Sequence, residues 1–341
     1  MSISFFHQEL AHFVHADQRS AYEKTIAAGD ALIGRGGEIS EIAIRVIKGT
    51  QMLRLHEALL TRNGLATVDR ALTDCGAAMV RQKEGGWKRY VGKTSPHSVR
   101  IETGYYPDAK EIGIRSSSAP EKRFSASALA PREGEIISVD FGEETLEGVL
   151  EQGPLTEHIR ACLASFEKDL ENIGLLLRAP NFHRYSDTRT GGIDGIRTLY
   201  TDGAQMHVVN QNTVHWQNET CPEHIDTRRY RPNIVMQGEG LTPNIEDMAF
   251  QMDVTTRNLG DVPLFYTSLT PRCATTSRDP LTGQNTGKQP NQWLSEHRPV
   301  RPWSNKPTMG ANVDTPPEYD GARIQVGSRL TIRSLKNNWK Q

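Results

Sequence analysis

Short runs of alternating apolar and polar residues fill the chain from Glu38 to about residue 150. The segments "EIAIRVIKG", "EIGIRS" and "EIISVDFG" are typical, and Gly, Pro, Asn and Asp stand between such segments. Alternation with a period of two places successive side chains on opposite faces of a β-strand. The pattern therefore predicts a β-rich domain over residues 38–150.

The flanking regions differ in pattern. Residues 3–32 carry apolar positions at helical spacing and end at "GRGG", which predicts an N-terminal helical extension over residues 1–37. The stretch "LTEHIRACLASFEKDLENIGLLL" predicts one helix and a short strand, which connect the two halves over residues 151–190. In residues 191–335 the "MHVV" strand leads into a helix, and "GARIQVGSRLTI" is a further β pattern. We expect a mixed α/β, β-rich fold, with loops over a site at 275–318.

Composition excludes several function classes. The chain has 341 residues, and 40 Lys and Arg against 41 Asp and Glu give a formal charge of -1. No sequence-wide basic field attracts nucleic acid or acidic membranes. The start of the chain lacks the pattern of a secretory signal, and no apolar run approaches the roughly 20 residues that span a bilayer. We expect a cytoplasmic protein that binds neither nucleic acid nor membrane.

Cys273 is the cysteine with the most informative surroundings. The four cysteines are scattered singly, without a CxxC pair, so a disulfide framework is not indicated. Cys273 lies in "SLTPRCATTSRDPLTG", with Arg272 beside it and Arg278 nearby. A thiolate is a soft metal ligand and a nucleophile that neighbouring cations stabilise. A buried, inert cysteine is the alternative, but a hydroxyl-rich turn favours a presented thiol.

Arg231 and Asn233 stand in "RRYRPNIV", where a proline fixes the backbone before an apolar strand. An arginine held at a strand entrance suits bidentate recognition of a phosphate or carboxylate, although an ordinary surface arginine would show the same pattern. Lys48 and Arg70, taken singly, are consistent with solvated charges.

The segment "HWQNETCPEH" contains His215, Cys221 and His224. These three residues match no strong zinc spacing, so the sequence gives only a weak indication of a structural metal site.

Together these segments resemble one family. The chain is similar to MOSC proteins with an N-terminal β-barrel domain, the group that includes the mitochondrial amidoxime-reducing components and their bacterial relatives. The resemblance covers about residues 38–332. The matching segments are "ISEIAIRVIKG", "GLATVDRA", "YTDGAQMHVV", "RRYRPNIV", "PRCATTSRDPLTG", "KPTMGANV" and "GARIQVGSRLTI".

The resemblance implies an N-terminal β-barrel-like domain, then a MOSC β-barrel domain with peripheral helices at 191–335. It also implies that Cys273 ligates the molybdenum of a molybdopterin cofactor. The other residues that the resemblance assigns to the cofactor are Lys48, Arg70, Thr213, Arg231 and Asn233.

This sequence departs from the family pattern at several places. Gly49 stands where members often have Ser, and Thr270 where many have a second Cys. Residues 244–270 and 284–312 differ most, with Trp293 and Trp303 as possible pocket walls or packing residues. A different substrate preference is expected from these differences.

The resemblance implies a molybdenum-dependent oxidoreductase that removes oxygen from N-hydroxylated small molecules, with electrons from a flavin or haem reductase. Two alternatives stay open. One is a carrier of cofactor sulfur that uses a persulfide on Cys273. The other is a repurposed MOSC module in a biosynthetic pathway that binds no molybdenum.

Overall fold

Strands dominate the computed structural model of the protein, which describes residues 29–90, 96–142, 144–182, 184–186, 195–201, 203–298 and 307–335. Most of the predicted N-terminal helical extension, residues 1–28, lies outside these ranges, as does Trp303. The described part begins with the short helix α3 (Gly29–Leu32). No helix in the described ranges is both long enough and apolar enough to cross a membrane.

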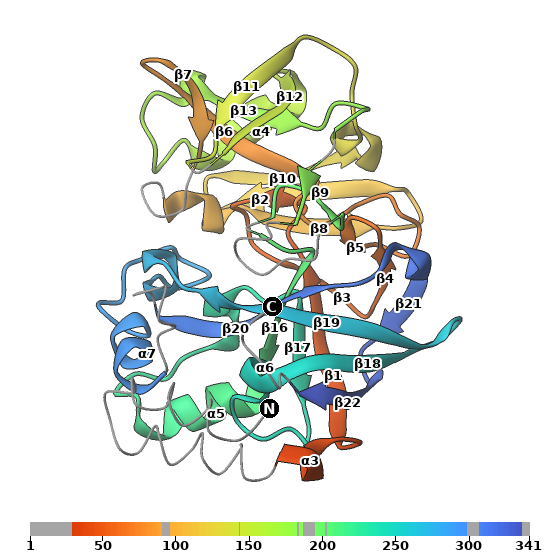
Figure 1. The fold of residues 1–341 in the computed structure, drawn as a ribbon. Helices are drawn as coiled ribbons and strands as arrows, with labels where there is room; N and C mark the ends of the chain where they lie inside the picture. Colours follow the sequence, from red (N-terminus) through yellow and green to blue (C-terminus); the bar gives the residue numbers. More distant parts are fainter. Residues whose placement is uncertain are drawn as a thin grey trace.

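A closed ring of seven strands forms the larger barrel, in the lower half of Figure 1. Its order is β17-β16-β20-β19-β18-β22-β1, and β1 pairs with β17 to close it. β3 (Leu53–Leu55) extends the sheet from β1. The seven strands are β1 (Gly36–Ile44), β16 (Met206–Asn210), β17 (Ile234–Gln237), β18 (Ala249–Thr256), β19 (Gly260–Pro271), β20 (Thr308–Asp314) and β22 (Arg329–Leu335).

Apolar side chains, which alternate with polar ones along the strands, fill the interior of this barrel. Met252 and Val254 of β18 are buried and pair with the buried Ile332 and Leu330 of β22. The residue between the first two, Asp253, bonds Arg333 on the outside at 2.6 Å. The closed barrel therefore encloses a hydrophobic core. The predicted β-rich, mixed α/β fold is confirmed.

β1 connects the two halves of the molecule. It pairs with β22 at its start, with β17 along its middle and with β3 at its end. Arg45 and Val46 separate β1 from β2 (Ile47–Lys48), which pairs with β6 (Ala77–Lys83) of another sheet. Arg45 therefore lies at the junction of the two sheets.

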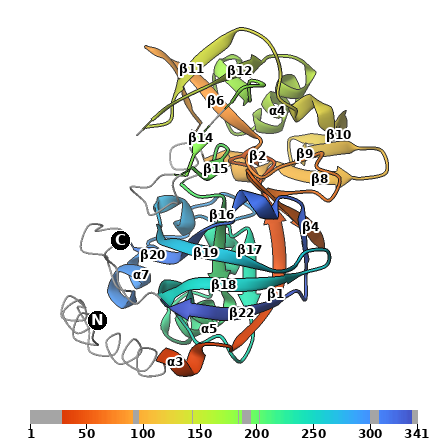
Figure 2. The same ribbon diagram turned by 45° about the vertical axis from the view of Figure 1, so that its right-hand side comes forward.

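The second sheet closes into a smaller ring, in the upper half of Figures 1 and 2. Its order is β13-β12-β11-β7-β6, and β13 pairs back to β6, with β2 attached at the edge. The five ring strands are β6 (Ala77–Lys83), β7 (Gly86–Arg89), β11 (Ile136–Asp140), β12 (Thr145–Glu151) and β13 (Ile173–Leu177). Helix α4 (Pro154–Leu163) packs beside it and contributes the buried Ile159 and Leu163 to the core.

Two small antiparallel sheets are added to the barrels: in Figure 1 the first lies between them and the second lies at the side of the larger one. One contains β8 (Glu102–Tyr106), β9 (Glu111–Ser116) and β10 (Ala119–Ser125), and the other contains β4 (Glu57–Thr61), β5 (Gly64–Ala66) and β21 (Ala322–Gln325). The second joins an N-terminal hairpin to a C-terminal strand, because Ala322 pairs with Leu60. A two-stranded pair, β14 (Arg184–Tyr185) and β15 (Arg197–Thr198), completes the sheets.

The strand pairings differ from the predicted domain boundaries at two places. β1, predicted to begin the N-terminal domain at residue 38, is a strand of the C-terminal barrel. β13, predicted to lie in a connector over 151–190, completes the smaller ring. In both cases the partner strand lies many residues away along the chain, so the local pattern does not reveal the pairing.

The expectation of loops over residues 275–318 is wrong for two segments. Helix α7 (Asn291–His297) buries Trp293 and Leu294. Strand β20 is buried at all seven positions, so it shows no alternation, and its Gly, Asn and Asp are typical of a loop. The polar groups are satisfied inside: Asn312 accepts from Thr270 (3.0 Å), and Asp314 accepts from the Gln205 amide (2.9 Å).

Helix α5 (Gln211–Thr220) follows β16, where the sequence predicted a strand leading into a helix. It lies with α3 at the end of the larger barrel that faces away from the smaller one (Figure 1). Helix α6 (Ile245–Met248) precedes β18. The opposite end of the larger barrel, where β1 ends and β16 and β17 begin, faces the smaller barrel.

Candidate functional site

Cys273 lies at that end, directly after β19 and before the 3₁₀ turn η6 (Ala274–Ser277). Its backbone oxygen accepts hydrogen bonds from Thr276 Oγ1 (2.9 Å) and Asn291 Nδ2 (3.0 Å), which fix the residue. Its thiol Sγ lies 3.2 Å from Thr275 Oγ1 and is otherwise exposed. The backbone is held while the sulfur stays accessible.

The other three cysteines are not presented in this way. Cys75 and Cys162 are buried, and Cys221 is half-buried. Burial raises the pKa of the thiols of Cys162 and Cys221, which favours the unreactive protonated form. Cys273 is the exposed one of the four.

A cavity of about 120 Å³ opens beside Cys273. Four arginines line it, and none of the described lining residues is an aspartate or a glutamate. The lining residues are Arg45, Thr201, Ala204, Met206, His207, Arg229, Tyr230, Arg231, Asn233, Thr270, Arg272, Cys273, Thr275, Thr276 and Asn312. Such a lining suits an anionic ligand.

Contacts from several elements position the arginines. Arg45 follows β1, and its guanidinium lies 3.7 Å from the Asp74 carboxylate. Arg272 follows β19 and donates from Nη1 to the Tyr230 carbonyl at 2.9 Å. Arg229 donates from Nη1 to Thr286 Oγ1 at 2.7 Å. Each of these contacts uses part of a guanidinium that carries five N–H donors.

Arg231 ends the 3₁₀ turn η5 (Thr227–Tyr230) in the left-handed backbone region, with φ 53°. This conformation is uncommon for a residue with a side chain, and Pro232 follows it directly. Its guanidinium reaches the loop between β2 and β3, where Nη2 donates to the Thr50 carbonyl. Arg231 therefore ties this loop to the cavity wall.

His207 of β16 lies in the cavity wall and is buried. Its Nε2 lies 3.1 Å from the Met309 carbonyl, so this nitrogen carries the proton. Burial holds the pKa of His207 well below its ordinary value, and the positive charges of Arg272 and Arg45 lower it further. The imidazole is neutral. Gly310 leaves it room, because a Cβ there would lie 2.4 Å from Nε2.

Asn233 is buried and joins two strands at the cavity. Its Nδ2 donates to the Ala43 carbonyl of β1 (3.2 Å), and its Oδ1 accepts from the His207 amide of β16 (2.9 Å). The structure thus brings Cys273, Arg231 and Asn233 to one cavity, and it assigns Asn233 a structural contact on each side.

Lys48, Arg70 and Thr213 do not line this cavity. Lys48 Nζ donates to the Tyr200 carbonyl at 2.5 Å, one residue before the lining Thr201. Arg70 is exposed and pairs with Asp320 at 3.1 Å.

Thr213 is fully buried in the first turn of α5. Its hydroxyl donates to Glu246 Oε2 (3.0 Å) and accepts from the Asn244 amide (2.8 Å). The Thr213 hydroxyl, which would have to donate to an anion, already donates to a carboxyl group inside the protein.

The weak zinc pattern finds no support, because the described residues contain no group of three or more potential metal-ligating side chains. Trp293 packs against Trp216 with ring centroids 5.1 Å apart and is a core residue rather than a pocket wall.

Sequence reasoning did not single out Arg45, His207 or Arg229 as site residues. Arg45 and His207 lie in β patterns, where a polar residue normally marks the solvent face. The sequence does show that Arg45 follows the predicted strand that is β1 and that His207 stands near the start of the strand that is β16. Only the long-range pairing of β1 with β17, which lies beside β16, brings the two residues together.

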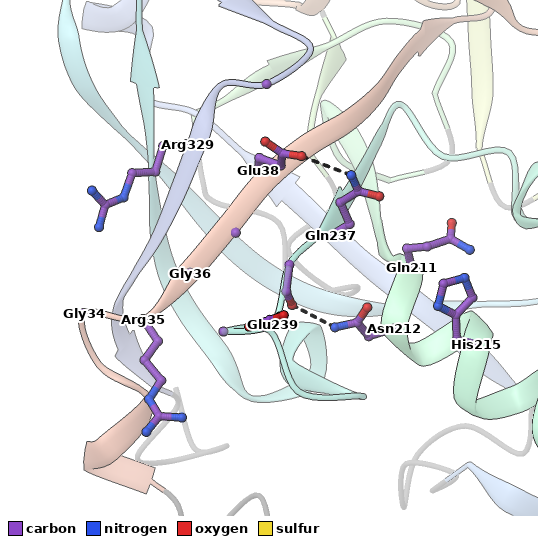
Figure 3. Close-up of a pocket in the computed structure, with 14 residues that line it drawn as sticks. Gly34, Arg35, Gly36, Glu38, Gln211, Asn212, His215, Gln237, Glu239 and Arg329 are labelled. Carbon is purple, nitrogen blue, oxygen red and sulfur yellow. Dashed lines mark hydrogen bonds between the residues drawn. The ribbon is translucent and has the colours of Figure 1, made fainter.

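A larger groove of about 840 Å³ lies at the far end of the barrel (Figure 3). Polar groups there pair with each other: Gln237 Nε2 donates to Glu38 (3.1 Å), and Asn212 Nδ2 donates to the Gly238 carbonyl (2.9 Å). His215 lies beside it on α5. The groove contains no cysteine and none of the predicted cofactor residues, so chemistry rather than size favours the smaller cavity.

Comparison with known families supports the MOSC part of the sequence resemblance, over the second half of the chain, whereas the resemblance to the amidoxime-reducing components stays a prediction. Residues 196–331 match the model of the MOSC domain, which is a molybdenum-cofactor sulfurase C-terminal-like domain. The match contains all the cavity residues except Arg45. No curated protein matches the chain.

Proposed function

Because residues 196–331 form a MOSC domain, we propose that the protein binds a molybdenum cofactor at Cys273 and reduces N-hydroxylated small molecules with it. One observation carries the proposal: the exposed cysteine of the chain borders a cavity lined by four arginines and, among its described lining residues, by no carboxylate. Thiolates are the ligands that soft transition metals prefer, and arginines suit the phosphate of a pterin cofactor.

The residues fit this cofactor in their chemistry. Cys273 would ligate the metal, and Arg231 with its neighbours Arg229, Arg45 and Arg272 would hold the anionic part. When bound, the cofactor supplies two-electron oxygen-atom transfer. A reductase with a flavin or haem group is the proposed partner that provides the electrons.

The protein's own groups would prepare the site. The Thr275 hydroxyl, 3.2 Å from Sγ, can donate to the thiolate form of Cys273 and so stabilise it for metal ligation. His207 stays neutral and donates to a carbonyl, so it adds no positive charge and fixes the start of β16. Overall, the substrate would lose its N–O bond, take up two electrons and two protons, and release water.

The family description supports a second candidate, a carrier of cofactor sulfur. In that function the same exposed Sγ would take a sulfane sulfur from a donor persulfide, whose thiol is the leaving group. No metal would be needed for this transfer. Metal content therefore separates the two functions.

The first experiment is elemental analysis of the protein and of Cys273→Ser, both purified from a host that makes the cofactor. We expect near-stoichiometric molybdenum in the protein and its loss in the variant. Cys221→Ser is the matched control, because Cys221 lies outside the cavity, and it should keep the metal. Samples that keep the metal should reduce an aromatic amidoxime with a chemical electron donor.

Well-folded protein without molybdenum would refute the reductase function. A persulfide that forms on Cys273 in such protein, and not in Cys273→Ser, would support sulfur transfer instead.

A further inference from the structure

A second cavity, of about 320 Å³, adjoins the cavity at Cys273. The two share Arg229, Arg231 and Thr275 in their walls, so these residues stand between them. Of these two cavities we call the second one the larger cavity. A molecule bound there is separated from the space beside the Cys273 thiol only by the side chains that the two walls share. Segments from both halves of the chain form this cavity: Thr50 and Val99 come from the first half and Arg278 from the second.

Positive charge dominates the wall of this cavity. Five arginines line it, against the two carboxylates Glu41 and Asp279. The five are Arg54, Arg228, Arg229, Arg231 and Arg278. The formal charge of the whole chain is -1, so this excess is local to the cavity rather than a property of the surface.

Both carboxylates in the wall already have partners, and the partner of Glu41 is one of the five arginines. Glu41 lies 3.3 Å from the guanidinium of Arg54, near the exposed rim. Asp279 Oδ1 accepts from the amides of Leu281 (3.0 Å) and Thr282 (2.7 Å) in its own loop. Burial acts to raise the pKa of Asp279, but these hydrogen bonds and the charge of Arg229 outweigh it and lower the pKa, so the carboxylate is ionised and held. It stabilises the loop that carries Arg278.

An apolar surface completes the wall. Val99, Val235 and Pro232 are buried in it, and Leu281, a residue that is 48% exposed, also lines it. Apolar surface beside arginines fits a ligand with an apolar body and a negatively charged end, since guanidinium groups bind oxyanions through paired N–H donors.

We propose that the larger cavity binds the anionic end of the substrate, so that the physiological substrate is an N-hydroxylated compound bearing a carboxylate or a phosphate on an apolar body. The inference rests on the proposed reductase function. In it, Arg278 recognises the oxyanion, while the N-hydroxyl group reaches the space beside Cys273. Arg278 is a specificity residue: it lines the larger cavity and does not line the cavity at Cys273.

The test compares three aromatic amidoximes that differ in the para substituent: carboxylate, phosphonate or neutral carboxamide. Protein loaded with molybdenum should show a kcat/KM at least about tenfold higher for one or both anionic compounds than for the carboxamide, as expected for one charge-assisted hydrogen-bonded pair. The better of the two anionic compounds identifies the oxyanion. The preference should shrink as salt is raised.

Arg278→Gln should lower kcat/KM for the anionic compounds towards the carboxamide value, mainly through KM, and leave the carboxamide unchanged. Arg54→Gln is the second variant, because this side chain is 60% exposed and its loss is tolerated more easily. It should reduce the preference by a smaller factor. Arg257→Gln is the matched control: Arg257 pairs with Glu57 at the surface, outside both cavities.

Equal kcat/KM for all three compounds would overturn the inference and leave the proposed function intact. Loss of molybdenum in Arg278→Gln, but not in Arg257→Gln, would also overturn it, since the cavity would then belong to the cofactor.

If molybdenum-loaded protein reduces none of the three, the proposed function fails. Calorimetric binding of the carboxylate and carboxamide compounds then decides the inference separately. Preferential binding of the carboxylate that Arg278→Gln abolishes would support the anion site, and equal or undetectable binding would overturn it.

Discussion

Glu246 offers the sharpest test of how the interior of the larger barrel is held. Its carboxyl group is fully buried, with Oε2 bonded to Thr213 and Oε1 3.9 Å from the Arg298 guanidinium. Asp247 is the closer partner of that arginine, at 2.7 Å. Burial, and then the negative charge of Asp247, raises the pKa of Glu246 to about 7. Glu246 therefore holds a proton in mildly acidic solution.

The direction of the pH effect follows from proton counting. An unfolded chain has a glutamate pKa of 4.5, against about 7 in the folded protein. Between these values the folded protein binds more protons than the unfolded chain, so stability falls as pH rises. Full stability is present below pH 4.5, and the loss is complete above the folded pKa. The difference corresponds to about 3 kcal/mol.

Glu246→Gln removes this titration and keeps an oxygen for the Thr213 hydroxyl. Urea unfolding followed by tryptophan fluorescence, from pH 4.5 to 8, gives the free energy of unfolding of both proteins. We expect the wild-type value to fall by about 3 kcal/mol more than that of the variant over this range. Asp247→Asn is the control, and it should destabilise the protein at every pH, because it removes the close partner of a buried arginine. Parallel curves for wild type and Glu246→Gln would refute the reasoning.

Three further predictions concern the cavity. Asn233→Ala should lower the free energy of unfolding of the cofactor-free protein by about 2–4 kcal/mol, measured by urea unfolding, because the buried amide of His207 and the buried carbonyl of Ala43 each lose a partner. Unchanged stability with reduced molybdenum content would instead show that Asn233 binds the cofactor directly. Arg231→Gln should reduce molybdenum content by elemental analysis, whereas Arg70→Gln, in a surface ion pair, should not; equal losses would contradict the geometry. Gly310→Ala should lower the melting temperature by several degrees, because φ is +74° and the added Cβ meets His207, and an unchanged value would count against the close packing.

The sequence predicted the elements of this fold better than their partners. The alternation in residues 38–150 and the strand before α5 are local properties, and the structure confirms both as β. β20 was missed because every residue in it is buried, so a seven-residue strand with Gly, Asn and Asp has no visible period. The pairing of β1 with β17 spans nearly 200 residues and has no local sequence signal.

The site was predictable where one residue's chemistry was enough. Cys273 stands out in the sequence by the hydroxyl-rich turn around it, and Arg231 by the proline that follows it. Both residues line the cavity. Arg45 and His207 do not stand out, because their role depends on which strand ends meet. Thr213 shows the converse: a hydroxyl at a helix start fits an anion site by position, but here it is bonded to a buried carboxyl group.

β1 also has a consequence for how the chain reaches its native state. As the chain is synthesised, residues 36–44 emerge early, yet their barrel partner β22 ends at residue 335. Until then β1 is a strand with an open edge, which is the kind of segment that pairs with the wrong chain. Contacts of such large sequence separation also make folding slow. A fragment limited to residues 196–331 would lack this strand and leave β17 and β22 without a partner on one side, so the region that matches the family is not the smallest unit that closes the barrel.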